Sequence, residues 1–92
     1  MKWTQEEAIA FECARECITD MMAICSGQIA EQKASNTPDA SRVQLLETEL
    51  ARLASERACL RGTDAAEIAR IRASYGKVIR DHRAGQKHPM AA

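Results

Sequence analysis

A stripe of large apolar residues in the middle of the chain constrains the fold more than any other feature. Its members are Val43, Leu46, Leu50, Leu53 and Leu60. They follow one another at the spacing of heptad a and d positions, and Arg57 occupies the one a position that interrupts them. Such a stripe packs along another helix at a shallow angle, so the sequence predicts an all-α protein with coiled-coil-like packing.

The length of the chain limits the size of its core. With 92 residues it forms one domain, and a core this small is marginal unless the chain pairs. No run of alternating β-branched residues indicates a strand. We therefore expect a small antiparallel bundle of two to three helices, with a long N-terminal helix, completed by homodimerisation.

Capping signals divide the chain into three helices. Thr4 opens a capping box, Thr37 precedes a proline suited to a first helical position, and Gly62 is followed by a new cap. The helices are expected over about residues 4–33, 38–61 and 64–82, in a domain spanning 1–84 that is followed by a flexible basic tail, 85–92.

The path of the chain at Gly62 has two solutions. Either the chain reverses there, or the second and third helices form one rod of about 68 Å at 1.5 Å per residue. The stop signals and the new cap favour reversal. Reversal also gives the first helix two neighbours, which its apolar face requires because that face covers about half of the helix circumference.

The charges are unevenly spread although their sum is zero. Residues 1–60 hold six basic and ten acidic side chains, whereas residues 61–92 hold seven basic and three acidic. The two parts therefore attract each other, within one chain or between two.

A basic flank on the third helix is a candidate nucleic-acid contact, made of Arg72, Arg80, Arg83 and Lys87. Four cations on one flank suit phosphates. However, no aromatic residues alternate with them to stack on bases. A solvated face, or pairing with the acidic face of the first helix (Glu12, Glu16 and Asp20), is the alternative.

Cys13 and Cys17 lie one helical turn apart and are the candidates for metal binding or thiol sensing. A structural zinc site needs four ligands, and no other cysteine or histidine has a matching spacing. Buried cysteines also act as small apolar residues in a core. We therefore expect no bound metal and no cofactor.

Other sequence features narrow the class of function. We find no glycine-rich phosphate loop, no zinc-protease motif and no nucleophile beside a base, so we expect neither an enzyme nor a small-molecule substrate. The N-terminus lacks the apolar stretch of a signal peptide, and the longest uncharged run, Met21–Ala30, is too short to cross a bilayer. A cytoplasmic protein without membrane association is expected.

These observations predict a protein–protein interaction module, such as an adaptor, inhibitor or accessory subunit. Its partners would be a second copy and an unidentified protein, docked along the Val43–Leu60 seam or the apolar face of the first helix. Leu45 and Cys59 share the c position and hint at a second contact surface. The alternatives are a nucleic-acid-binding regulator that uses the basic flank, or a thiol or metal sensor.

Overall fold

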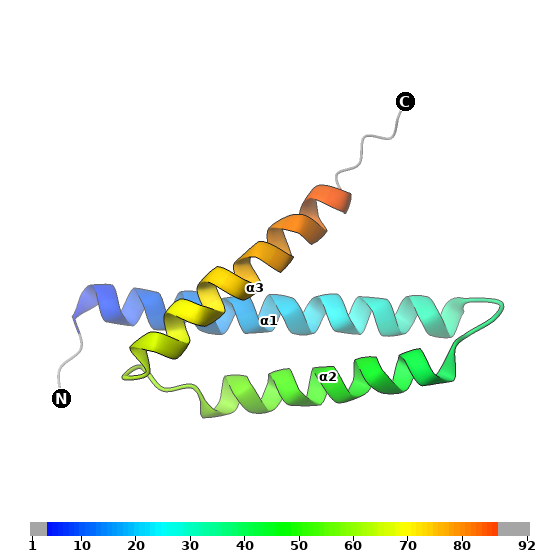
Figure 1. Ribbon diagram of the computed structural model, residues 1–92, viewed down its shortest axis with the longest axis horizontal. Helices are drawn as coiled ribbons and strands as arrows, with labels where there is room; N and C mark the ends of the chain where they lie inside the picture. The colour runs from blue at the N-terminus through cyan, green and yellow to red at the C-terminus, as the bar shows by residue number, and fades with distance from the viewer. Residues whose placement is uncertain (1–3, 87–92) are drawn as a thin grey trace.

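The computed structural model describes residues 4–86, and these form three helices joined by two short connections (Figure 1). The helices are α1 (Gln5–Ala34), α2 (Ala40–Cys59) and α3 (Ala65–Gln86). No strand occurs within residues 4–86. The expected small all-α bundle with a long first helix is therefore confirmed, whereas dimerisation stays a prediction.

The first helix begins where its capping box predicts. The Thr4 hydroxyl accepts a hydrogen bond from the Glu7 amide at 3.0 Å, and the Glu7 carboxylate accepts one from the Thr4 amide at 2.9 Å. Two amides that lack partners inside the helix are satisfied in this way. The box fixes the start of α1 from local sequence alone.

The second helix begins two residues later than expected, because Asp39 caps it instead of Thr37. The Asp39 carboxylate accepts a hydrogen bond from the Arg42 amide at 3.1 Å, while the Thr37 amide donates to the Ser35 hydroxyl. Pro38 therefore lies in the connection and not at the first helical position. Aspartate is at least as good a cap as threonine, which explains the shift.

The chain reverses direction between α2 and α3, as the capping signals at Gly62 predict. Leu60 is extended and ends α2, and the Asp64 carboxylate accepts a hydrogen bond from the Arg61 amide at 3.2 Å. The third helix then continues to Gln86, four residues beyond the expected end at His82. The rest of the expected tail, 87–92, lies outside the described residues.

The three helices do not form a parallel-sided bundle. α1 and α2 run antiparallel and side by side, whereas α3 crosses α1 obliquely and then separates from it (Figure 1). No Cα atom of α2 lies within 8 Å of one in α3. The radius of gyration is 15.9 Å, against about 12 Å for a compact domain of this length. The fold is therefore open.

The core lies where both other helices meet α1. Its buried apolar residues are Ala14, Ile18 and Cys25 from α1, Leu46 and Leu53 from α2, and Ile68, Ile71, Tyr75 and Ile79 from α3. Ile18, Leu53 and Ile71 are fully enclosed. Each helix thus contributes one large enclosed aliphatic side chain to a single cluster.

The heptad seam is used inside the chain. Its d residues Leu46 and Leu53 are buried against the core, whereas Val43 and Leu50 at a positions, and Leu60 at the end of α2, are half-buried. The seam therefore packs largely against α1 of the same chain. Docking of a partner along the seam stays a prediction.

Candidate docking surface

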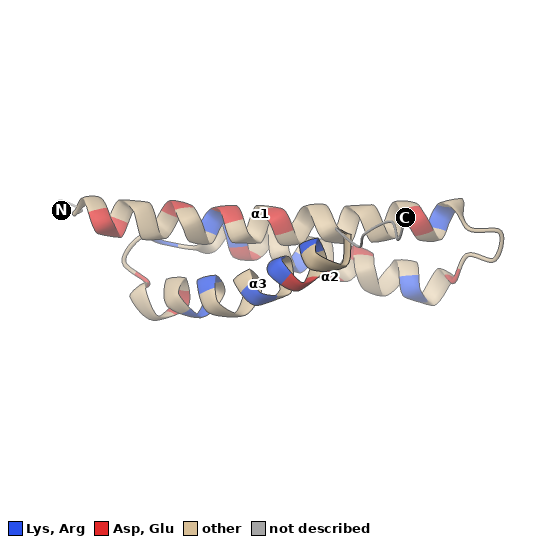
Figure 2. Cartoon of the chain, turned by 90° about the horizontal axis from the view of Figure 1, so that it is seen from above, with Lys and Arg blue, Asp and Glu red and all other residues tan. Residues whose placement is uncertain are grey.

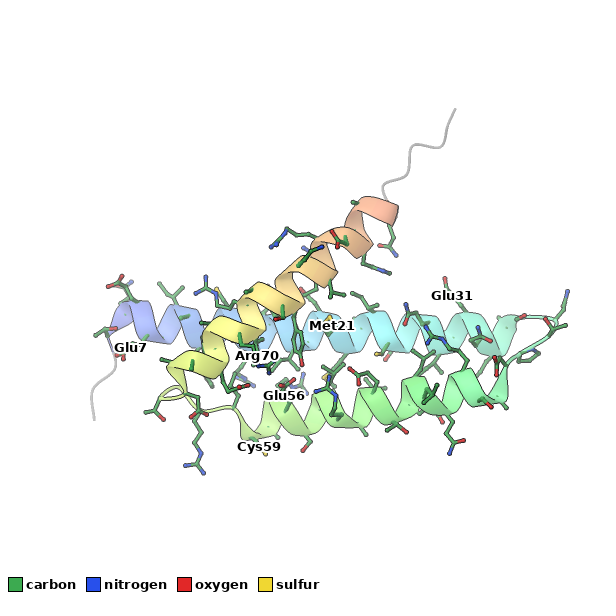
Figure 3. All side chains as sticks on the ribbon, in the orientation of Figure 1. Glu7, Met21, Glu31, Glu56, Cys59 and Arg70 are labelled. Carbon is green, nitrogen blue, oxygen red and sulfur yellow. The ribbon has the colours of Figure 1, made fainter. Side chains whose placement is uncertain are left out.

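A polar cluster joins α3 to α2 across the gap between their backbones (Figure 3). The Tyr75 hydroxyl donates a hydrogen bond to Glu56 Oε1 at 2.6 Å, and Arg70 Nη2 donates to Glu56 Oε2 at 2.8 Å. The Arg70 guanidinium also stands over the Tyr75 ring, 5.6 Å from its centroid. We call these three residues the polar bridge; they fix the place where α3 crosses the hairpin of α1 and α2.

Two further ion pairs support the polar bridge from either side. Arg52 binds Glu49 one turn away and donates to the Tyr75 hydroxyl at 3.4 Å, and Arg70 also pairs with Glu67. These hydrogen bonds lower the pKa of Glu49 and of Glu67 and raise the pKa of both arginines. Each charge already has a partner, so the cluster acts as a structural clamp.

Beyond the polar bridge, α3 stays against α1 through Ile79 and Arg83, but no hydrogen bond or ion pair within residues 4–86 joins it to α2 there. Leu45 lies two helical turns before Arg52 and so shares its face of α2, but its side chain is 65% exposed. On α1, Met21 and Cys25 lie one turn apart on the side that faces the core. We call Leu45 and the hairpin surface around it the open face; it is the place that a third helix would cover in a closed bundle, whereas Cys25 and Leu46 are already buried.

A second feature lies where α1 and α3 diverge. Here the helices enclose a groove of about 300 Å³, which we call the fork. Its α1 wall carries Asp20, Ile24 and Glu31, and its α3 wall carries Ile79, His82 and Arg83. Arg83 Nη2 donates to Asp20 Oδ2 at 3.2 Å across the fork. Glu31 points away from α2, toward the side on which α3 projects (Figure 3).

The structure separates the residues of the expected nucleic-acid contact. Arg83 pairs with Asp20 of the acidic face of α1, whereas Arg72 and Arg80 are exposed and form no ion pair within residues 4–86. The Arg80 guanidinium lies over Gly76, 3.2 Å from where a Cβ atom would stand. Lys87 lies outside the described residues. The alternative interpretation was that these cations pair with acidic residues of α1. Within residues 4–86, this holds for Arg83 only.

The four cysteines are free thiols in different environments. Cys13 and Cys59 are exposed, Cys17 is half-buried and Cys25 is buried. Burial raises the pKa of the Cys17 and Cys25 thiols above the ordinary value. No group of three potential metal ligands forms in the part of the chain that the structure describes.

Sequence reasoning identified part of this surface and missed the rest. The c position marked Leu45 as a contact residue, but the polar bridge joins residues 19 positions apart and has no local signature. Tyr75 offered the only signal, since a buried tyrosine hydroxyl needs a hydrogen-bond partner. The divergence of α3 also exposes Val78, which is 45% exposed although its spacing places it with the apolar face of that helix.

No protein-family model, curated protein or solved structure matches this chain. None of the helices within residues 4–86 is both long and apolar enough to cross a membrane.

Proposed function

We propose that this protein is a non-enzymatic interaction module that binds an amphipathic helix of another protein on its open face. The observation that carries the proposal is that α3 covers only one half of the α1–α2 hairpin and leaves Leu45 65% exposed over the other half. A helix laid there would complete the three-helix packing. Helix-in-groove docking is a common mode of peptide recognition.

Leu45 would anchor the partner helix. Burial of a leucine side chain contributes about 1.5–3 kcal/mol, and two thirds of the Leu45 surface remains to be buried. The partner would therefore need a short apolar stripe at helical spacing, flanked by polar residues.

The cytoplasm is the compartment that we propose for this binding, because exposed thiols at Cys13 and Cys59 suit a reducing environment. Nucleic-acid binding and thiol or metal sensing stay predictions. The open face uses neither the Arg72–Arg80 flank nor the Cys13–Cys17 pair.

Site-specific photo-crosslinking in the native cell tests the proposal. A photoreactive residue replaces Leu45 in one variant and, as the matched control, exposed Ser55 in the other. Ser55 lies on the side of α2 that is opposite the seam, about 80° around the helix from Leu45. We expect one dominant protein adduct at position 45 and none at position 55. Leu45→Glu should then abolish recovery of the same protein while the helical circular dichroism stays unchanged.

Two results would contradict the proposal. Equal adducts at positions 45 and 55 would mean that contact is not confined to the open face. Undiminished recovery of the partner by the Leu45→Glu variant would mean that the partner binds elsewhere, since a carboxylate cannot be buried there without loss of affinity.

A further inference from the structure

The charges that α1 and α3 leave unpaired are opposite in sign. Within residues 4–86, α1 leaves Glu6, Glu16 and Glu31 without an ion pair, and α3 leaves Arg72 and Arg80 without one. Figure 2 shows the same division, with mostly acidic bands along α1 and mostly basic bands along α3. The chain therefore carries unpaired charges of both signs on different helices. Two copies can pair more of these charges than one copy can.

The C-terminal half of α3 projects as an arm beyond the rest of the molecule (Figure 1). We call the segment Gly76–Gln86 the arm. It carries Val78, which is 45% exposed, and Arg80, whose charge is unpaired among the described residues. The arm flanks the fork, where Ile24 and Ile79 supply apolar surface. An apolar side chain thus stands exposed beside an unfilled groove of the same chain.

We propose that two copies of this chain pair through their arms, so that the arm of each copy lies against the fork of the other. A two-fold axis makes every contact occur twice. Val78 of one copy packs toward Ile24 of the other, and Arg80 of one copy meets Glu31 of the other. This contact uses the fork and the arm, leaves the open face free, and goes beyond the proposed function.

Charge complementarity favours a second copy of this chain as the partner that fills the fork. The described part of α1 has six acidic and two basic side chains, whereas α3 has two acidic and five basic. An antiparallel pairing of two such chains brings each acidic helix to a basic one. The seam residues Leu46 and Leu53 are buried inside the chain, whereas the charges of the arm and of α1 remain exposed for a second copy.

Analytical ultracentrifugation over a wide concentration range tests the pairing. We expect the wild-type chain to dimerise reversibly. The dissociation constant should rise with salt concentration, because salt screens the paired charges. Glu31→Arg alone, or Arg80→Glu alone, places like charges opposite each other twice. Each variant should raise the dissociation constant roughly tenfold or more.

The decisive sample is an equimolar mixture of the two single variants. In a mixed dimer, the arginine at position 31 faces the glutamate at position 80, and the remaining wild-type pair is intact, so both contacts become attractive again. The mixture should therefore associate about as tightly as the wild type, and so should a chain that carries both substitutions. Arg42→Glu makes the same change of charge away from the fork and should leave association unchanged.

Three results overturn the pairing. They are a wild-type chain that is monomeric at every concentration, a dimer that neither single variant weakens, and single variants that weaken it without rescue in the mixture. Circular dichroism establishes that each variant keeps its helical content. Since neither substitution lies on the open face, failure here leaves the crosslinking result at Leu45 unaffected.

Discussion

The contact between α1 and α2 differs in kind from the contact between α1 and α3. The first follows the heptad seam along the length of α2, with the Gln32 side chain bonded to the Asp39 amide at one end and Arg57 bonded to Thr19 near the other. The second is concentrated where α3 crosses α1, around Ile71, and the polar bridge ties the same part of α3 to α2. Past Ile79, only the exposed Arg83–Asp20 pair joins α3 to α1 among the ion pairs of residues 4–86.

This difference separates scaffold from interaction surface. A seam of regular spacing holds two helices together along many residues, so their relative position is strongly determined. A crossing fixed at one point lets the rest of the helix depart and leaves neighbouring surfaces uncovered. The open face and the fork both result from that departure. The hairpin is therefore the rigid element, and α3 decides which parts of it remain available.

The largest effect should come from the seam. Leu53 is fully buried, so Leu53→Ala should lower the free energy of unfolding by about 2–5 kcal/mol, because it removes transfer energy and leaves a cavity. Leu45→Ala is the matched control and should cost less than about 0.5 kcal/mol, since that side chain stands mostly in solvent. Urea unfolding measures both. Similar losses for the two leucines would contradict the assignment of inner and outer faces.

The polar bridge should have an intermediate effect that is confined to α3. Tyr75→Phe removes a hydrogen bond to a carboxylate and should lower the free energy of unfolding by about 0.5–1.5 kcal/mol. Hydrogen exchange should accelerate in α3 and stay unchanged in α1 and α2. A double-mutant cycle with Glu56→Gln should show coupling between the two positions. Additive effects would mean that the bond contributes nothing to stability.

Replacement of a glycine by alanine in α1 and in α3 should stabilise the two helices to different extents. A Cβ atom at Gly27 of α1 would meet nothing within 4 Å, so Gly27→Ala should raise the free energy of unfolding by about 0.5–1 kcal/mol through helix propensity alone. Gly76→Ala in α3 should gain less, because its Cβ would press on the Arg80 guanidinium at 3.2 Å. Thermal unfolding of both variants compares them. A loss of stability at Gly27 would show that α1 needs flexibility there.

The smallest effect should be a dependence on pH at Glu49. Its hydrogen bond from Arg52 holds its pKa below the usual value, so the stabilisation is complete above the pKa of the unfolded chain and is lost as pH falls through the folded pKa. The side chain is 39% exposed, so screening limits the contribution to about 0.5 kcal/mol. Glu49→Gln should therefore reduce the loss of stability on acidification. Unfolding curves at neutral and acidic pH check this, and an unchanged acid response would contradict it.

The sequence predicts the helices and the hairpin because the signals for both are local or periodic. Thr4 and Glu7 are three residues apart, and the spacing of Leu46 and Leu53 alone places them on one face. The start of α2 was predicted wrongly because Thr37 and Asp39 are both capable caps and only the folded chain selects between them.

The crossing of α3 could not be predicted in the same way. Its place depends on Glu56 and Tyr75, which are distant in sequence and meet only after the hairpin has formed. The spacing of Val78 assigns it to an apolar face without showing that α3 has left its neighbour by that residue. The open face and the fork both result from this crossing. The sequence therefore identifies Leu45 as exposed, but it does not show that α3 leaves the surface beside Leu45 uncovered.

Methyl-to-methyl nuclear Overhauser contacts in the isotopically labelled protein test the open arrangement most directly. We expect the methyl groups of Ile71 to show contacts with the core of the α1–α2 hairpin, since all belong to one buried cluster. The methyl groups of Leu45 and Val78 should show none with each other, because α3 has already separated from α2. A clear contact between Leu45 and Val78 would mean a closed bundle and would remove both proposed docking surfaces.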